Sequence, residues 1–175
     1  MDPTCRLRAR RRAAVGLVYP ARRPRQFARH IVLKQPDQRE AGSRLIVVDA
    51  SVVANVIGDD GAEGRRPRSE LRVAGQVAAP ALVDVETVVV LHKRWLAGAL
   101  SERRFVVAID DLAAIDVHRY PTLALMRRAF DLRANVTAYD ATHVALAEGL
   151  PCELLTGDGR LTNASDTPCA IRLLW

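Results

Sequence analysis

The chain has 175 residues, of which 49% are hydrophobic and 26% charged, a composition typical of one globular domain with its own core. Its formal net charge of +6 is unevenly distributed. Residues 1–44 contain 12 Lys and Arg against 3 Asp and Glu, whereas residues 45–175 contain 14 against 17. The basic excess lies in the N-terminal segment, so the high pI is no argument that the rest of the chain binds nucleic acid.

Residues 1–44 are arginine-rich, contain four prolines and show no sustained hydrophobic period. We expect them to lie outside the fold, as a disordered tail or as translated sequence upstream of the true start. A basic arm that binds nucleic acid is the alternative. No run approaches the roughly 18 apolar residues of a membrane span, and no secretory signal is present, so the sequence predicts a cytoplasmic protein with no membrane partner.

The three cysteines, Cys5, Cys152 and Cys169, are odd in number and lack CxxC spacing. The cysteines therefore suggest neither a disulfide framework nor a zinc site. We expect Cys152 and Cys169 to behave as small buried hydrophobic residues.

Strands and helices alternate from Leu45 onward. The apolar run 45–48 predicts a short buried strand, and a helix over 51–57 follows it. The charged segment 62–74 contains a proline and predicts a loop with a short helix. Residues 76–80 predict a second strand. Residues 82–100 predict a long helix that is apolar nearly all round, and its apolar sides would face the core alone or the core and a subunit interface.

The next segments continue the alternation. Residues 101–111 predict a helix and residues 114–117 a third strand. Pro121 is well placed to open another helix. The inner stripe of that helix is predicted to be Leu123, Met126 and Phe130.

The C-terminal third adds a further helix and two strands. Thr137 and Asp140 have the spacing of a capping box, which predicts a helix over 140–148. Residues 151–155 and 170–174 predict the last two strands, with a turn and a short helix between them. Strands that alternate with helices predict an α/β fold with a central parallel sheet and right-handed crossovers.

Four acidic residues are predicted to meet at one edge of this sheet. Asp49 and Asp158 directly follow strands, Glu86 begins the long helix and Asp140 opens a later one. Each acid alone has an ordinary explanation as a helix cap or as a carboxylate near a helix N-terminus. Together they would repel one another, and a bound cation would remove that repulsion.

The residue types at this edge indicate a hard divalent metal. Carboxylates without His or Cys suit Mg²⁺ or Mn²⁺ rather than zinc. Such an ion is suited to phosphodiester hydrolysis by activated water. Ser51 and Thr156 have hydroxyls beside the acids that could orient a carboxylate or a metal-bound water.

Four motifs together resemble the PIN-domain ribonucleases, and more narrowly the VapC toxins of bacterial toxin–antitoxin pairs. They cover residues 45–175 in the family's order and read VVDAS from Val47, APALVDVE from Ala79, TAYDATHVALAE from Thr137 and LLTGDGRL from Leu154.

The resemblance implies a PIN-like three-layer α/β/α nuclease domain over residues 45–175, with RNA as substrate. It also implies a toxin homodimer and a cognate VapB-like antitoxin, which we expect to place an arginine among the carboxylates. The implied metal ligands are Asp49, Glu86, Asp140 and Asp158, with Thr156 in a supporting role.

Two alternatives from other classes are weaker. A phosphoryl-accepting receiver domain needs an acid pair at the first strand and a lysine near the last one, and both are missing. A non-catalytic PIN-fold RNA-binding module is disfavoured because all four acids are present.

Several neighbouring residues are left out of the predicted site. Asp84 should point away from Glu86, because two residues span about 200° of a helix. His143 is expected to be a packed or surface residue. Candidate RNA contacts without geometry are Arg65, Arg66, Arg68, Arg94 and Arg119.

Overall fold

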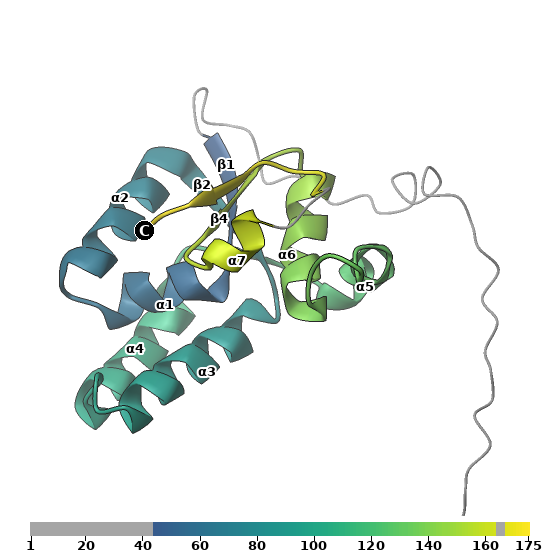
Figure 1. Ribbon diagram of the computed structural model, residues 1–175. Coiled ribbons are helices and arrows are strands. Elements are labelled where there is room, and N and C mark those ends of the chain that lie inside the picture. The colour runs from purple at the N-terminus through teal and green to yellow at the C-terminus, as the bar shows by residue number, and fades with distance from the viewer. Residues whose placement is uncertain (1–43, 164–166) are drawn as a thin grey trace, which may run out of the picture.

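The computed structural model describes residues 44–163 and 167–175 and forms a three-layer α/β/α fold (Figure 1). Five parallel strands form one sheet in the order β3-β2-β1-β4-β5. The strands are β1 (Arg44–Val48), β2 (Gly75–Pro80), β3 (His118–Tyr120), β4 (Glu153–Thr156) and β5 (Ile171–Leu173). The predicted α/β class and the central parallel sheet are confirmed.

Seven helices connect the strands of the described part. They are α1 (Ala50–Gly58), α2 (Ala62–Ala74), α3 (Val83–Leu96), α4 (Glu102–Ala114), α5 (Thr122–Asp131), α6 (Ala138–Gly149) and α7 (Gly159–Thr162). Helices α1 to α4 pack together on one side of the sheet, and α5 packs on α6 on the other side. None of these helices is long and apolar enough to cross a membrane.

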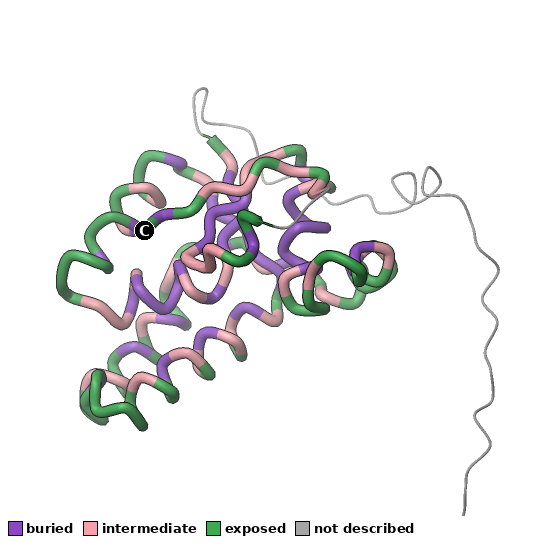
Figure 2. The backbone as a smooth tube through the Cα atoms, in the orientation of Figure 1, coloured by how far each residue is buried: buried purple, intermediate pink, exposed green. Residues whose placement is uncertain are grey.

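Alternation along β1 divides the core between the two faces of the sheet. Ile46 and Val48 belong to the cluster under α1, whereas Val47 packs with α5 and α6. All three are at most 1% exposed. Burial is accordingly concentrated in the strands and in the inner faces of α1 and α6 (Figure 2). A strand that is apolar on both faces therefore occupies the middle of the sheet, as such a run predicts.

Two element predictions are wrong, each for a local reason. Residues 62–74 form one continuous helix although Pro67 lies inside it. Pro67 is buried, and Arg68 donates to the carbonyls of Val56 and Asp59, so packing against the end of α1 outweighs the proline. Residues 114–117 are not a strand: Ala114 is the last residue of α4, residues 115–117 form the loop after it, and the third strand is β3. A short apolar run is compatible with a buried strand and with the end of a buried helix, so the sequence does not distinguish these two structures.

The predicted inner stripe of α5 is also wrong. Leu123 is 85% exposed and Phe130 51%, whereas Leu125 and Ala129 are buried against α6. Both sets of residues recur at helical spacing, so the sequence alone favours neither. Leu125 and Ala129 belong to the core cluster that contains residues of α6 and the sheet, and Leu123 and Phe130 remain outside it.

Helix α3 is buried on one side in the single chain. Val83, Thr87 and Leu91 face the core, while Val85 is 69% exposed and Val89 46%.

The prediction for residues 1–44 lies outside the described residues, except for Arg44, which begins β1. Cys152 and Cys169 are partly buried against the α5–α6 core, and this burial raises the pKa of each thiol to about 11.

Candidate active site

Asp49 stands at the end of the central strand and caps the helix that follows it. One carboxylate oxygen, Oδ1, accepts the backbone N–H of Val52 at 3.0 Å and the hydroxyl of Ser51 at 2.6 Å. The other oxygen, Oδ2, accepts the Thr156 hydroxyl at 2.5 Å. Capping therefore uses one oxygen, and the second faces the neighbouring strand β4.

Two hydroxyls hold the loops after β1 and β4 together. Thr156 is fully buried, and its Oγ1 also accepts the backbone N–H of Asp158 at 2.9 Å. Ser51 Oγ accepts the backbone N–H of Gly157 at 2.8 Å. The side-chain position of Asp49 and the backbone position of Asp158 are thus fixed by one network, as a support for metal ligands requires.

Glu86 carries the most perturbed carboxylate of the site. Burial, together with the charges of Asp49 and Asp140, raises its pKa to about 7. Its Oε2 is buried without a hydrogen-bond partner in the described part and lies 3.7 Å from Nε2 of His143. A buried carboxylate between two like charges is unfavourable unless a proton or a cation is added.

His143 lies on α6 and is a packed residue, as expected, with 2% of its surface exposed. Its Nδ1 lies 3.2 Å from the carbonyl of Tyr139, and burial lowers the pKa of the imidazole. We therefore treat His143 as neutral, and its contact with Glu86 is no ion pair between two charges. With Nδ1–H donating to Tyr139, Nε2 is an acceptor that faces another acceptor.

Asp140 and Asp158 both stand near helix N-termini. The Thr137 hydroxyl donates to Asp140 Oδ2 at 2.7 Å and accepts the Asp140 N–H at 3.3 Å, which confirms the capping region. Asp158 Oδ1 caps α7 by accepting the Arg160 N–H at 2.9 Å. The side chain of Arg160 pairs with Asp158 and holds the pKa of that carboxyl below its ordinary value.

We call Asp49, Glu86, Asp140 and Asp158 the acidic edge. Their charges act on shared neighbours, because Asp49 and Asp140 raise the pKa of Glu86 while Asp140 and Asp158 raise that of Arg160. Among residues 44–163 and 167–175, however, no three Asp, Glu, His or Cys side chains are close enough to hold one ion. A single metal cage of all four acids stays a prediction.

The donor set at this edge still fits Mg²⁺ or Mn²⁺. It consists of carboxylate oxygens, which hard cations prefer. Glu86 also offers a buried oxygen that no donor satisfies in the described part, and its raised pKa reports the repulsion that a cation would relieve.

Comparison with known proteins decides the family. The PIN domain model matches residues 46–166. VapC ribonuclease Mb0985 of Mycobacterium bovis is 37% identical over 133 residues, which cover 74% of this chain and 98% of that protein. The chain belongs to the PIN domain family, with the VapC ribonucleases.

Solved structures show the same fold as this PIN domain. VapBC2 from Rickettsia felis, bound to a DNA fragment from its promoter, has a TM-score of 0.55 at 10% identity, covering 74% of this chain and 98% of that one. Mycobacterium tuberculosis VapC20, described as a toxin that cleaves the sarcin-ricin loop, has a TM-score of 0.52 at 19% identity, covering 71% and 98%.

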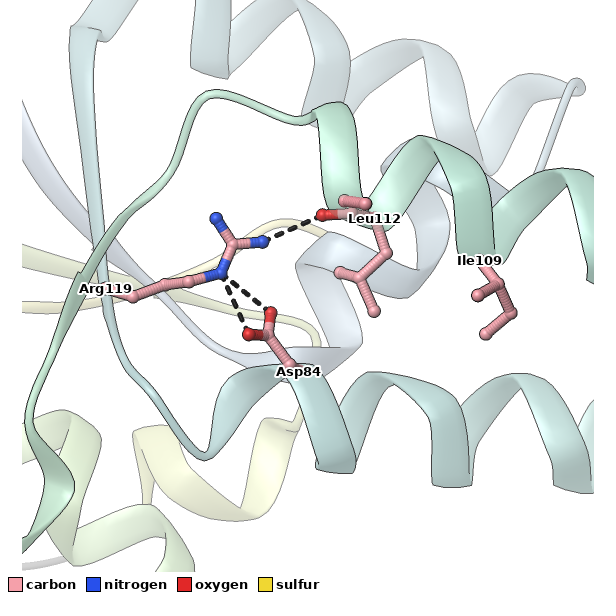
Figure 3. Close-up of a pocket in the computed structure, with 5 residues that line it drawn as sticks. Asp84, Ile109, Leu112 and Arg119 are labelled. Carbon is pink, nitrogen blue, oxygen red and sulfur yellow. Dashed lines mark hydrogen bonds and ion pairs between the residues drawn. The ribbon is translucent and has the colours of Figure 1, made fainter.

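Asp84 points away from the acidic edge of this PIN domain, as its helical angle to Glu86 predicts. Both of its carboxylate oxygens accept Arg119 Nε at 2.9 Å, and Arg119 also donates to the Leu112 carbonyl (Figure 3). The pair lines a pocket of about 350 Å³ together with Ile109, Leu112 and Ala113. The Asp84 carboxylate thus pairs with Arg119 of β3 and lines a pocket with residues of α4.

Three of the candidate RNA-contacting arginines make hydrogen bonds within the fold of the PIN domain. Arg119 pairs with Asp84, Arg68 bonds the carbonyls at the end of α1, and Arg94 bonds the Asn55 side chain. Arg65 and Arg66 are exposed on α2. Sequence reasoning missed Arg160, although its position two residues after Asp158 at a helix start was a usable signal.

Proposed function

We propose that this PIN domain is a metal-dependent endoribonuclease that acts as the toxin of a VapBC-type pair. The single observation that carries the proposal is Glu86, a buried carboxylate with an unsatisfied oxygen and a pKa of about 7 caused by burial and by Asp49 and Asp140. The sequence similarity to a VapC ribonuclease supports RNA as the substrate.

The residues of the chain prepare the acidic edge for that reaction. Thr156 and Ser51 restrict the rotation of the Asp49 carboxylate, so its oxygens keep one direction while a substrate binds. The Thr137 hydroxyl restrains the Asp140 carboxylate in the same way, and the Arg160 N–H restrains that of Asp158. Mg²⁺ or Mn²⁺ held by the four acids would supply an activated water and hold the scissile phosphate.

The test is cleavage of total cellular RNA by the purified full chain with Mg²⁺, and the same reaction with EDTA. We expect cleavage by the wild-type chain with Mg²⁺, and a loss of at least about 100-fold with EDTA or in Asp49→Asn. Asp84→Asn is the matched control, because it removes a carboxylate two residues from Glu86 that faces Arg119. Equal cleavage by wild type and Asp49→Asn would contradict the proposal.

The proposed partner is a VapB-like antitoxin that places a guanidinium at the acidic edge. The edge already binds one guanidinium, that of Arg160, through both oxygens of Asp158. The VapBC2 structure supports a complex of this kind for a protein of the same fold. Expression of the chain alone should arrest growth, co-expression of the neighbouring gene should relieve the arrest, and Asp49→Asn should cause none.

We also propose a homodimer through exposed apolar residues of α3 and α5. The two helices begin side by side, because the Leu82 N–H donates to the Thr122 hydroxyl at 3.1 Å. Val85 and Leu123 lie one turn or less beyond these positions, and both are largely exposed. Leu123→Asp should reduce the mass measured by light scattering to that of one chain while the melting temperature of the monomer is kept.

A further inference from the structure

Arg160 is an exposed arginine that lies against the acidic edge. Its Nε is 3.1 Å from Asp158 Oδ1 and 3.2 Å from Oδ2, and its Nη2 is 2.7 Å from Oδ2. The side chain of Arg160 is 92% exposed and that of Asp158 is 30% exposed. The charge of Arg160 also interacts with Asp140, so it acts on two of the four acids.

This ion pair is easily opened without moving the carboxylate. Exposed pairs contribute little to stability because water screens them and because long side chains lose entropy when they are fixed. Asp158 has two other restraints, the Arg160 backbone N–H on its Oδ1 and the bond from its own N–H to Thr156. The guanidinium can therefore leave while Asp158 keeps its place.

A guanidinium and a divalent metal ion compete for the same carboxylate, because each neutralises the charge that attracts the other and the two positive groups repel. In the pair with Arg160, the charge of Asp158 is already balanced by a residue of its own chain. A guanidinium released from Asp158 would remain beside the edge, since it is held by two residues of backbone.

The released charge has a use at this position. Residues 45–175 carry a net negative charge, and the proposed site concentrates carboxylates where an anionic substrate has to bind. Arg68, Arg94 and Arg119 are engaged in the fold. A guanidinium matches phosphate in the same bidentate geometry in which it matches carboxylate.

We propose that Arg160 is an internal counter-ion that pairs with Asp158 in the metal-free protein, is displaced by the divalent metal and then binds a phosphate of the RNA. This inference rests on the proposed function. It assigns Arg160 two measurable effects of opposite sign: it weakens metal binding in the absence of RNA and strengthens RNA binding in the presence of metal.

The first measurement is Mn²⁺ binding to the metal-free full chain by calorimetry, without RNA. Arg160→Gln should bind Mn²⁺ at least about twofold more tightly than wild type, because the competing charge is gone. Arg160→Lys keeps the charge and should lie closer to wild type. Arg103→Gln, which removes an exposed arginine on α4, is the control and should match wild type. Unchanged or weaker Mn²⁺ binding by Arg160→Gln overturns the inference.

The second measurement is the binding of a labelled, 2′-O-methylated single-stranded oligoribonucleotide at saturating Mn²⁺, with all four acids intact and the oligonucleotide checked for integrity after each titration. Adding Arg160→Gln should make the slope of log K against log salt shallower by about 0.7, the value for one phosphate contact on a single strand. An equal slope overturns the phosphate contact. If the wild-type chain binds Mn²⁺ and cleaves RNA while Arg160→Gln changes neither measurement, this inference fails alone; if the wild type does neither, the proposed function fails with it.

Discussion

Removal of the Glu86 charge should stabilise the metal-free protein at high pH. The pKa of Glu86 is raised from its ordinary 4.5 to about 7 by burial and by its acidic neighbours. The difference between these two pKa values corresponds to about 3 kcal/mol of destabilisation of the native state once Glu86 is ionised. The side chain is 20% exposed, so water screens part of this energy, and we expect about 1–2 kcal/mol.

The sign of the pH dependence follows from proton binding. Below its ordinary pKa, Glu86 is protonated in both the native and the unfolded chain and has no effect on their balance. Between that value and about 7 the unfolded chain releases the proton while the native chain retains it, so stability falls as the pH rises. Above about 7 the whole penalty is present. Gln at this position is uncharged throughout and has no penalty.

The assay is urea unfolding of wild type and Glu86→Gln in EDTA at several values between about pH 5 and pH 8. The unfolding free energy of Glu86→Gln minus that of wild type should rise by about 1–2 kcal/mol from the low to the high end of this pH range. A Gln amide near His143 Nε2 adds an offset that does not depend on pH, so the slope is the result to read. Glu102→Gln, at an exposed carboxylate of α4, should give a flat difference. A flat difference for Glu86→Gln would refute the reasoning.

The other predictions use paired variants. Asp49→Asn should lose most of the rise in melting temperature that Mn²⁺ gives to wild type, whereas Asp84→Asn should keep it; calorimetry with and without Mn²⁺ distinguishes them. Thr156→Val should reduce the unfolding free energy by about 1–3 kcal/mol, because the buried groups that its hydroxyl serves lose a partner, and an unchanged urea midpoint would contradict this. Leu125→Ala should cost about 2–5 kcal/mol, because Leu125 is buried in the α5–α6 core, and a loss of less than about 0.5 kcal/mol would restore the stripe predicted from sequence.

The sequence predicted best the features that depend on one strand or one helix. The central strand is apolar on both faces, so its place in the middle of the sheet and the position of Asp49 at its end follow from local pattern. The direction of Asp84 followed from the helical angle to Glu86, and the Thr137 cap from its spacing to Asp140.

The features that failed depend on contacts between distant segments. Residues 62–74 look unsuited to a helix until Arg68 is seen to bond carbonyls at the end of α1. The buried side of α5 depends on which residues meet α6, and two stripes fit the helical period equally. The ion pair of Asp158 with Arg160 was likewise not predicted, because residue spacing alone does not show which charged side chains pair.

The bond between Thr156 and Asp49 also has a consequence for the timing of activity. It joins residues 107 positions apart, so Asp49 acquires this partner only after β4 has been synthesised and has docked beside β1. A nascent chain that ends before Thr156 contains three of the four acids but lacks the hydroxyl that orients the first. The ribosome therefore completes nearly the whole polypeptide before the centre exists, and fragments released by premature termination or early proteolysis should be harmless to the cell that makes them.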